Sequence, residues 1–255
     1  MSYSHLKIKC IGCERKGVKF NQEHVFPRWL ILKTGTDKTG IKWFGGKNIP
    51  ALSCTIPLCK QCNDLFGQKL EVPVSKIFNK LESDKGINDH ECEILTRWLW
   101  KLEGIFWHIG NSQGKKYTGI YTLSQRVLNP IDQIRGRLVL AVSRFNEDKK
   151  THKDLPMGVD SRNELSAIFV SGVFSKLAML VTLDDFIDFI PNNFTCYKLK
   201  NKLDMSDKDI VLAPKIGFKN GIDAIKTTID CSITLSRLHD QFGTMLKFMV
   251  ANKQI

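Results

Sequence analysis

The chain has 255 residues, of which 42% are hydrophobic and 25% are charged, so it is long enough to bury a core without disulfides or a partner. This composition excludes collagen-like, low-complexity and wholly disordered proteins. Lysine and arginine outnumber aspartate and glutamate by 38 to 26, and the formal charge of +12 favours a polyanion such as nucleic acid as a partner.

The N-terminal end carries most of this excess charge. Residues 1–50 contain ten Lys/Arg and three Asp/Glu, which accounts for +7 of the total.

The start has no apolar signal-peptide core, and the most apolar later stretch, 166–183, is interrupted by polar residues. We therefore expect neither export nor a membrane span. In the expected location, the reducing cytoplasm, paired cysteines are metal ligands or redox groups rather than structural disulfides.

Two Cys-x-x-Cys pairs form the strongest motif in the sequence. The first is Cys10 and Cys13, and the second is Cys59 and Cys62. Each pair can place two thiolates on one face of a tight turn, and two such turns make a closed tetrahedral cage that suits structural Zn2+ with sulfurs at about 2.3 Å. The alternatives are a redox pair and chance pairing of free thiols. Four other cysteines lack this spacing and are interpreted as small buried hydrophobes: Cys54, Cys92, Cys196 and Cys231.

A Glu-His dipeptide lies between the two pairs. Glu23 and His24 are followed by Pro27, and Asn63 comes directly after the second Cys pair. A mostly neutral histidine can take a proton from water at pH 7, and carboxylate and amide oxygens suit Mg2+ or Mn2+. Phosphodiester hydrolysis needs such a base and such a cation. Because side chains alternate along a regular strand, Glu23 and His24 can face one phosphate only from a loop or bulge, which we expect here.

Together these residues resemble the HNH endonuclease family. Its ββα-metal site runs from one Cys pair through an acidic residue, His and Pro to a second pair followed by His or Asn. The resemblance covers about residues 8–80 and implies a metal-dependent endonuclease. It implies that His24 is the general base and that Glu23 and Asn63 hold the catalytic Mg2+ or Mn2+. It also implies that the zinc knuckles clamp the hairpin bearing His24 to a helix starting near Asn63.

The chain departs from the family pattern at one position. Cys54 stands where the middle Asn of the pattern is expected. That Asn braces the loop carrying the base, so either Ser53 or Thr55 braces the loop in this chain or the loop is held differently.

Basic and aromatic residues interleave in the long segment between His24 and Cys59. The aromatic ones include Trp29, Trp43 and Phe44. Stacking of a base on these rings and gripping of backbone phosphates would suit nucleic-acid binding. A solvated basic loop with its aromatic rings packed into the small domain is an equal alternative. The candidate phosphate-binding residues are Arg28, Lys33, Lys42 and Lys47.

A helix is expected after Cys62. Leu65, Phe66 and Leu70 would form its apolar face. Asp64 is expected at the N-terminal end, where the helix dipole favours an acid. Glu71 lies just over two turns beyond Asn63 and is expected to be solvated.

A polar run at 83–88 marks the predicted boundary between an N-terminal module, 1–85, and a mixed α+β region, 86–255. Beyond it, apolar residues recur at helical spacing over 94–109, with Asn88 and Glu91 as a capping pair.

Three further elements are expected in the second region. Residues 166–182 are rich in Ile, Phe and Val and predict a strand or hairpin. A short helix over 183–190 should end at Pro191, and residues 235–249 again show helical spacing.

The sequence thus predicts an α+β fold, with a zinc-stapled ββα-metal module followed by a mixed α+β region. The expected function is metal-dependent cleavage of DNA in restriction or anti-phage defence, with Zn2+ structural and Mg2+ or Mn2+ catalytic. The alternatives are a non-catalytic zinc-knuckle protein that binds DNA or RNA, and an RNase. Residues 86–255 are expected to supply target recognition, a regulatory protein partner or a homo-oligomer interface.

Overall fold

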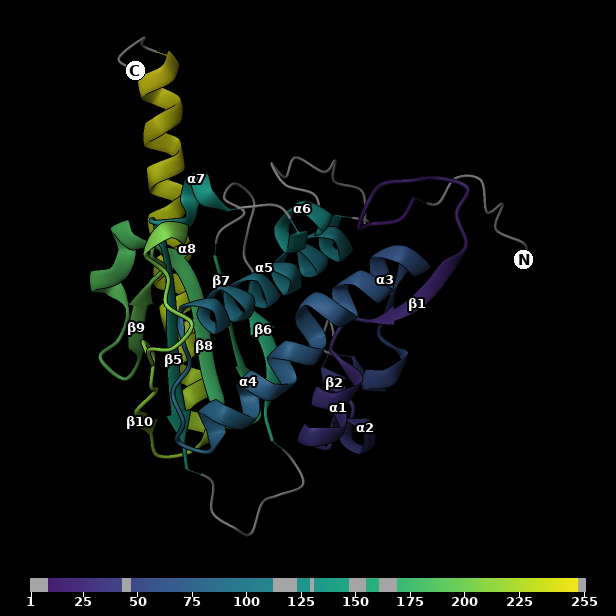
Figure 1. Ribbon diagram of the computed structural model, residues 1–255, viewed down its shortest axis with the longest axis horizontal. Helices are drawn as coiled ribbons and strands as arrows, with labels where there is room; N and C mark the ends of the chain where they lie inside the picture. Colours follow the sequence, from purple (N-terminus) through teal and green to yellow (C-terminus); the bar gives the residue numbers. More distant parts are fainter. Residues whose placement is uncertain are drawn as a thin grey trace.

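The computed structural model describes residues 9–42, 47–111, 123–128, 131–146, 155–160 and 169–251 (Figure 1). Trp43, Phe44 and the first part of the strand predicted at 166–182 lie outside these ranges. Helices and strands are mixed along the described chain, which confirms the α+β class.

Two antiparallel strands followed by a helix form the N-terminal unit. β1 (Phe20–His24) pairs with β4 (Thr55–Cys59), and β4 leads directly into α3 (Lys60–Phe66). The helix begins slightly before the position predicted from the sequence, so Asn63 lies within its first turn.

The pairing of β1 with β4 is regular. Each residue of β1 faces one residue of β4, down to His24 opposite Thr55. The ladder continues past the strand because the Val25 N–H donates to the Cys54 carbonyl at 2.8 Å. The loop or bulge expected at Glu23 and His24 is therefore wrong, and strand alternation puts the two side chains on opposite faces.

Five short elements connect β1 to β4: α1 (Arg28–Thr34), α2 (Thr36–Thr39), β2 (Ile41–Lys42), β3 (Asn48–Ile49) and the 3-10 helix η2 (Ala51–Ser53). Pro27 occupies the N-cap of α1, consistent with the predicted end of the strand before it. Gly35 adopts φ 74° between α1 and α2, a left-handed conformation that favours glycine.

After α3 the helical path continues through a π-helical turn, η3 (Gly67–Glu71), into α4 (Val72–Glu82). Phe66 and Leu70 are buried, as predicted for the apolar face of this helix. The polar run predicted as a boundary forms the turn between α4 and α5 (Asp89–Asn111).

A reciprocal pair of hydrogen bonds starts α5. The Glu91 N–H donates to Asn88 Oδ1 at 2.9 Å, and the Asn88 N–H donates to Glu91 Oε2 at 3.2 Å. This is the predicted capping box, in which each side chain satisfies a backbone donor that the helix leaves unpaired. Two short helices follow: α6 (Leu123–Leu128) and α7 (Asp132–Arg135).

A six-stranded sheet dominates the second region. Along it the strand order is β10-β5-β8-β7-β6, and β9 also pairs with β5. The hairpin of β7 and β8 confirms the strand pair predicted there, and its turn contains Ser175 at φ 55°. The six strands are β5 (Leu138–Phe145), β6 (Met157–Asp160), β7 (Val170–Phe174), β8 (Leu177–Leu183), β9 (Thr195–Lys198) and β10 (Ile216–Phe218).

The remaining helical elements are η4 (Asp184–Phe189), η5 (Lys202–Asp204) and α8 (Gly221–Ala251). η4 is the predicted short helix before Pro191, in 3-10 form. The predicted C-terminal helix starts earlier than its apolar spacing indicated, and the Asp223 N–H donates to the Asn220 side chain at its beginning (2.9 Å).

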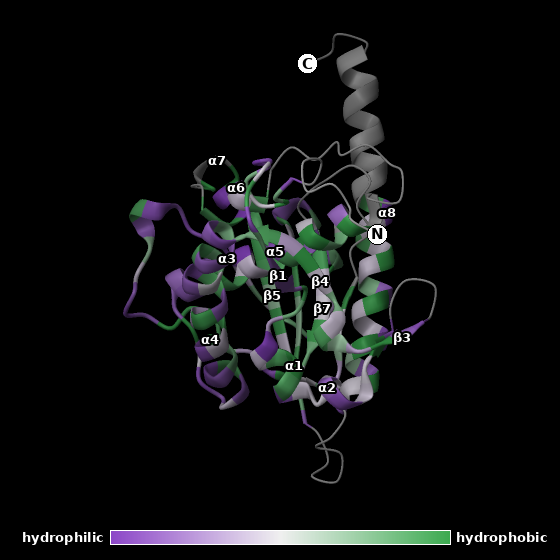
Figure 2. Cartoon of the chain, turned by 90° about the vertical axis from the view of Figure 1, so that its right-hand side faces the viewer, coloured by the Kyte–Doolittle hydropathy of each residue, from purple (hydrophilic) through white to green (hydrophobic). Residues whose placement is uncertain are grey.

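The central strands are buried on both faces, because α5 covers one face and α8 the other. On β5, Leu140 belongs to the cluster on the α5 side, and its neighbour Ala141 belongs to the cluster on the α8 side. In Figure 2 the sheet strands are mostly green, which marks hydrophobic residues, and α4 carries many purple, hydrophilic residues.

Three aromatic rings join the two predicted regions. Trp98 on α5 packs edge-on against Phe78 of α4 at 5.5 Å and against Phe174 of β7 at 5.2 Å between ring centroids. All three rings belong to one hydrophobic cluster, so the residues on both sides of the expected boundary share a core. None of the described helices is both long enough and apolar enough to cross a membrane.

Candidate functional site

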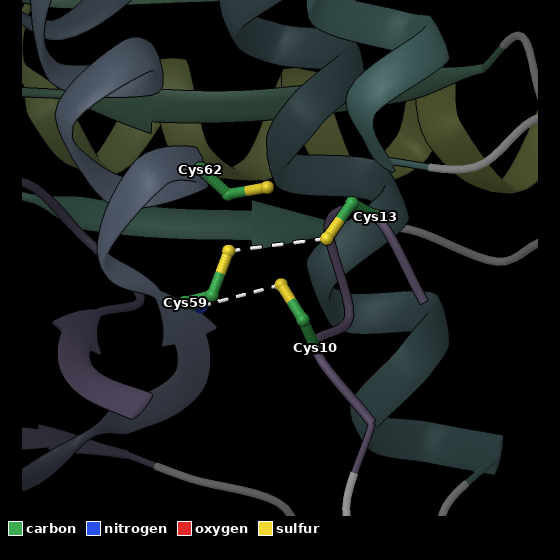
Figure 3. Close-up of side chains that lie close together, drawn as sticks. All are labelled: Cys10, Cys13, Cys59 and Cys62. Atoms are coloured by element: carbon green, nitrogen blue, oxygen red, sulfur yellow. Dashed lines mark hydrogen bonds between the residues drawn. The ribbon is translucent and has the colours of Figure 1, made fainter. Parts of the chain in front are cut away.

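Four cysteines converge beside the start of α3. Cys10 and Cys13 lie in the turn before β1, Cys59 ends β4, and Cys62 is in the first turn of α3. Their sulfurs point toward a common centre (Figure 3) and lie within 4.8 Å of one another. All four are free thiols, so the two predicted Cys-x-x-Cys pairs do form a single cluster.

The spacing of the sulfurs fits a tetrahedral metal ion. With zinc–sulfur bonds of about 2.3 Å, the sulfurs of a tetrahedron are about 3.8 Å apart. Cys13 Sγ and Cys59 Sγ are separated by 3.8 Å. Four soft thiolates are a donor set that zinc prefers, so this cluster could hold Zn2+ in a closed structural site.

The turn that carries Cys10 and Cys13 packs tightly against the segment that carries Cys59 and Cys62. A Cβ atom at Gly12 would lie 3.0 Å from Cys62 Sγ and 3.2 Å from the Leu58 side chain. The glycine therefore lets the backbone between the first two cysteines approach the helix that carries the fourth.

Hydrogen-bond donors surround the sulfurs. The Cys59 N–H donates to Cys10 Sγ at 3.3 Å, and Arg15 Nε donates to Cys13 Sγ at 3.1 Å. Arg15 also reaches Gln61 on α3 (2.6 Å), so this arginine ties the first knuckle to the helix. Donors of this kind orient metal-bound thiolates and offset their negative charge.

The thiols of the cluster differ in acidity. Burial raises the pKa of Cys13, but the Arg15 side-chain and backbone hydrogen bonds outweigh it and lower this pKa to about 6. Burial raises the pKa of Cys10 and of Cys62 above the ordinary thiol range. Binding of Zn2+ would displace protons from these buried thiols, because the thiolate is the ligand form.

Glu23 meets a buried lysine that the sequence did not reveal. Lys101 on α5 is 1% exposed, and its Nζ lies 3.7 Å from Glu23 Oε1 and 2.6 Å from Glu71 Oε1. Trp98 Nε1 donates to the second Glu71 oxygen at 3.3 Å. The expectation that Glu71 is solvated is therefore wrong, because its carboxylate closes a buried ion-pair cluster of Glu23, Lys101 and Glu71.

This cluster perturbs the Glu23 carboxyl. Burial raises its pKa, Lys101 lowers it, and the neighbouring Glu71 charge raises it, with an upward result. A buried lysine between two carboxylates leaves a formal charge of −1, so the cluster still favours an additional cation.

His24 and Asn63 are both half-buried, on β1 and on α3. The Nδ1 atom of His24 is buried without a hydrogen-bond partner in the part of the chain that the structure describes. Among the described residues, no hydrogen bond or ion pair links Glu23, His24 and Asn63 to one another. The unit of β1, β4 and α3 holds them on connected elements, and the roles assigned to them stay predictions.

The loop after His24 is braced by the backbone of Cys54. The Cys54 carbonyl accepts the Val25 N–H, while the Thr55 hydroxyl bonds to the Gln22 side chain on β1. Of the two residues considered for bracing, Thr55 contacts the strand, whereas Ser53 bonds to the nearby Pro50 carbonyl.

The four candidate phosphate-binding residues differ in their surroundings. Arg28, Lys42 and Lys47 are exposed. Lys33 is paired with Glu82 at 2.7 Å and also bonds to Asn79, so it links α1 to α4.

Trp29, one of the aromatic residues in this basic segment, is partly buried and packs against the core. Trp29 packs edge-on against Phe78 with 5.1 Å between ring centroids. Its neighbours in the basic segment, Trp43 and Phe44, lie outside the described residues.

Comparisons of the chain with protein-family models, with curated proteins and with solved structures gave no match.

Proposed function

We propose that this protein is a metal-dependent endonuclease of the HNH type that hydrolyses phosphodiester bonds in DNA. One observation carries the proposal. The strand bearing His24 is paired with the strand that runs into the helix bearing Asn63, and four clustered thiols join the segment before the first strand to the start of that helix.

In this proposal the two metals have separate tasks. Zn2+ on Cys10, Cys13, Cys59 and Cys62 fixes the separation of β1 and α3. A catalytic Mg2+ or Mn2+ supplies charge stabilisation to the scissile phosphate and the leaving oxygen when it is bound.

The chain's own residues would perform the proton transfer and hold the ion. His24 takes a proton from the attacking water, and its buried, unpartnered Nδ1 atom is consistent with a site that lacks its ligand. Glu23 and Asn63 provide the oxygen ligands, and Glu23 would have to turn from Lys101 toward the face of His24. The restriction or anti-phage role and the cytoplasmic location are parts of the same proposal.

The test is cleavage of plasmid DNA by the zinc-loaded chain with His24→Ala. Removal of the general base should lower the cleavage rate by about 100-fold or more, while zinc content and thermal unfolding stay unchanged. The control is Lys76→Ala, which truncates an exposed side chain on α4 and should leave the rate unchanged. Full activity of His24→Ala would exclude this histidine as the base.

A second function is a non-catalytic zinc-stabilised protein that binds DNA or RNA. The regular register of β1 favours it, because Glu23 and His24 point to opposite faces and Glu23 already pairs with Lys101. Tight binding of DNA without cleavage under any divalent ion would support this alternative. Cleavage of RNA but not DNA in the same assay would identify an RNase.

A further inference from the structure

A second, basic cleft lies beside the long helix α5, outside the proposed cleavage site. It has a volume of about 650 Å3 and is bounded by η3, α5, α6, α7 and the segment around η5. Two carboxylates, Glu93 and Asp207, also line it, so its formal charge is +2 with His90 neutral. Its four cationic residues are Lys69, Arg97, Arg135 and Lys202.

Three charged side chains, Glu93, Arg97 and Arg135, form a largely buried cluster at the floor of the cleft. Glu93 accepts from Arg97 Nε at 2.8 Å and from Arg135 Nη2 at 2.6 Å. Both arginines are at most 10% exposed at their side chains, and Arg97 also donates to the carbonyl of Arg126 at 3.0 Å. Two guanidinium groups on one carboxylate leave a net positive floor whose geometry is fixed before any ligand arrives.

Two exposed lysines add positive charge at the mouth of the cleft. Lys69 on η3 and Lys202 on η5 are exposed, and neither has an ion-pair partner among the described residues. A lysine on a flexible stem is a point charge suited to a phosphate group. The mouth and the floor together are therefore complementary to an anion.

One wall of the cleft is apolar. Leu70 and Val127 are buried in it, while Leu128 is 39% exposed. A ligand that fits both surfaces has an anionic group and a flat apolar group. A nucleotide unit, with its phosphate and its base, has this combination. The volume is within the range of sites that take ligands of this size.

The cleft lies next to the buried cluster of Glu23, Lys101 and Glu71. Arg97 is four residues before Lys101 on α5, so the two side chains lie on one face of the helix and about 6 Å apart along its axis. On η3, Leu70 lines the cleft and the adjacent Glu71 binds Lys101. The cleft and the Glu23 cluster are therefore neighbours along α5 and η3.

We propose that this cleft binds a nucleotide unit of a nucleic-acid strand, with the phosphate at Lys69 and Lys202 over the Arg97–Glu93–Arg135 floor and the base against Leu128. Assignment of the unit to the substrate strand rests on the proposed nuclease function. The anion site itself does not, because it is defined by its own charges and shape.

The test is the affinity of the zinc-loaded full chain for a short fluorescein-labelled single-stranded DNA, measured by anisotropy without added Mg2+ or Mn2+. Lys69→Gln combined with Lys202→Gln should weaken binding about 25-fold at 0.1 M salt, since each single-strand phosphate contact contributes roughly a factor of five through counterion release. The slope of log affinity against log salt should fall by about 1.4. Leu128→Glu should weaken binding, because it replaces the apolar surface against which the base packs with a charged side chain.

Lys76→Gln is the matched control, because Lys76 is exposed on α4 and does not line the cleft. Affinities of the double variant and of Leu128→Glu within twofold of this control would overturn the proposal.

In a second arm, a free deoxynucleoside monophosphate replaces the labelled strand. If the double variant loses that nucleotide but binds the strand normally, the assignment to a strand is wrong. Plasmid cleavage is scored separately, so a chain that binds through the cleft but does not cut contradicts only the nuclease function.

Discussion

Lys101 compensates the negative charge of the two carboxylates beside β1. It is almost fully buried and has carboxylates on two sides, one from β1 and one from η3. A buried ion pair contributes little net stability compared with apolar packing, but removal of one partner leaves a charge without compensation. In this cluster the loss of the lysine would leave two carboxylates, Glu23 and Glu71, facing each other.

Lys101→Met should therefore lower the free energy of unfolding by about 3–5 kcal/mol in urea denaturation. The control is Lys60→Met, which breaks the exposed pair with Asp64 and should cost less than about 0.5 kcal/mol. Combining Lys101→Met with Glu71→Gln should restore part of the loss, because one unpaired charge is removed. Equal stability of Lys101→Met and Lys60→Met would show that the cluster does not hold β1 to α5.

At the scale of elements, the unit of β1, β4 and α3 depends on the four-cysteine cluster. A two-stranded ribbon is only marginally stable alone, so it needs support from other contacts. The sulfurs bring the turn before β1 close to the junction of β4 and α3, and a side chain larger than glycine at position 12 would crowd Cys62 and Leu58.

Cys62→Ser should abolish stoichiometric zinc binding and lower the midpoint of thermal unfolding, because the metal's binding free energy contributes to folding. The wild-type chain should carry about one zinc ion, measured by elemental analysis. Cys196→Ser changes a half-buried thiol on β9, outside the cluster, and should keep that zinc. Equal zinc content in both variants would contradict the assignment of Cys62 as a ligand.

Local sequence patterns predicted several elements correctly. The capping box of Asn88 and Glu91, the hairpin of β7 and β8 and the two Cys-x-x-Cys turns all depend on residues close together in the sequence. The largely buried position of the Glu71 side chain depends on a partner 30 residues away, Lys101, which no local pattern reveals. The π-helical turn also matters, because it contains one more residue than an α-helical turn and rotates the residues that follow it.

The regular register at Glu23 was missed for a different reason. The motif argued for a bulge so that both neighbours reach one phosphate, whereas the backbone of Cys54 extends the ladder beyond the strand. The sequence therefore predicts which strands and helix carry the candidate residues, but it does not predict how their side chains are oriented.

At the scale of the whole molecule, the buried side chains of the predicted N-terminal module belong to a hydrophobic cluster that extends into the second region. Phe78 of α4 packs on Trp98, which packs on Phe174 of the sheet, and the buried side chains on both sides of the expected boundary form one cluster. The second region thus supports the first physically, in addition to any role in recognition.

A fragment of residues 1–85 should therefore lack a cooperative urea transition even when zinc is present. Without α5 it would expose Phe78 and leave Glu23 and Glu71 without Lys101. The full chain, measured in parallel by far-ultraviolet circular dichroism, should unfold cooperatively. A cooperative transition of the fragment at a similar midpoint would show that residues 1–85 fold as an independent domain.

In the proposed function, the zinc-stapled unit of β1, β4 and α3 cleaves DNA with a second, catalytic metal ion. The most direct measurement is conversion of supercoiled plasmid to nicked and linear forms by the zinc-loaded wild-type chain, with and without Mg2+ or Mn2+. We predict conversion only when the divalent ion is added, with the zinc content unchanged throughout. Intact plasmid under every divalent ion, despite a full complement of zinc and measurable binding to DNA, would contradict the nuclease function.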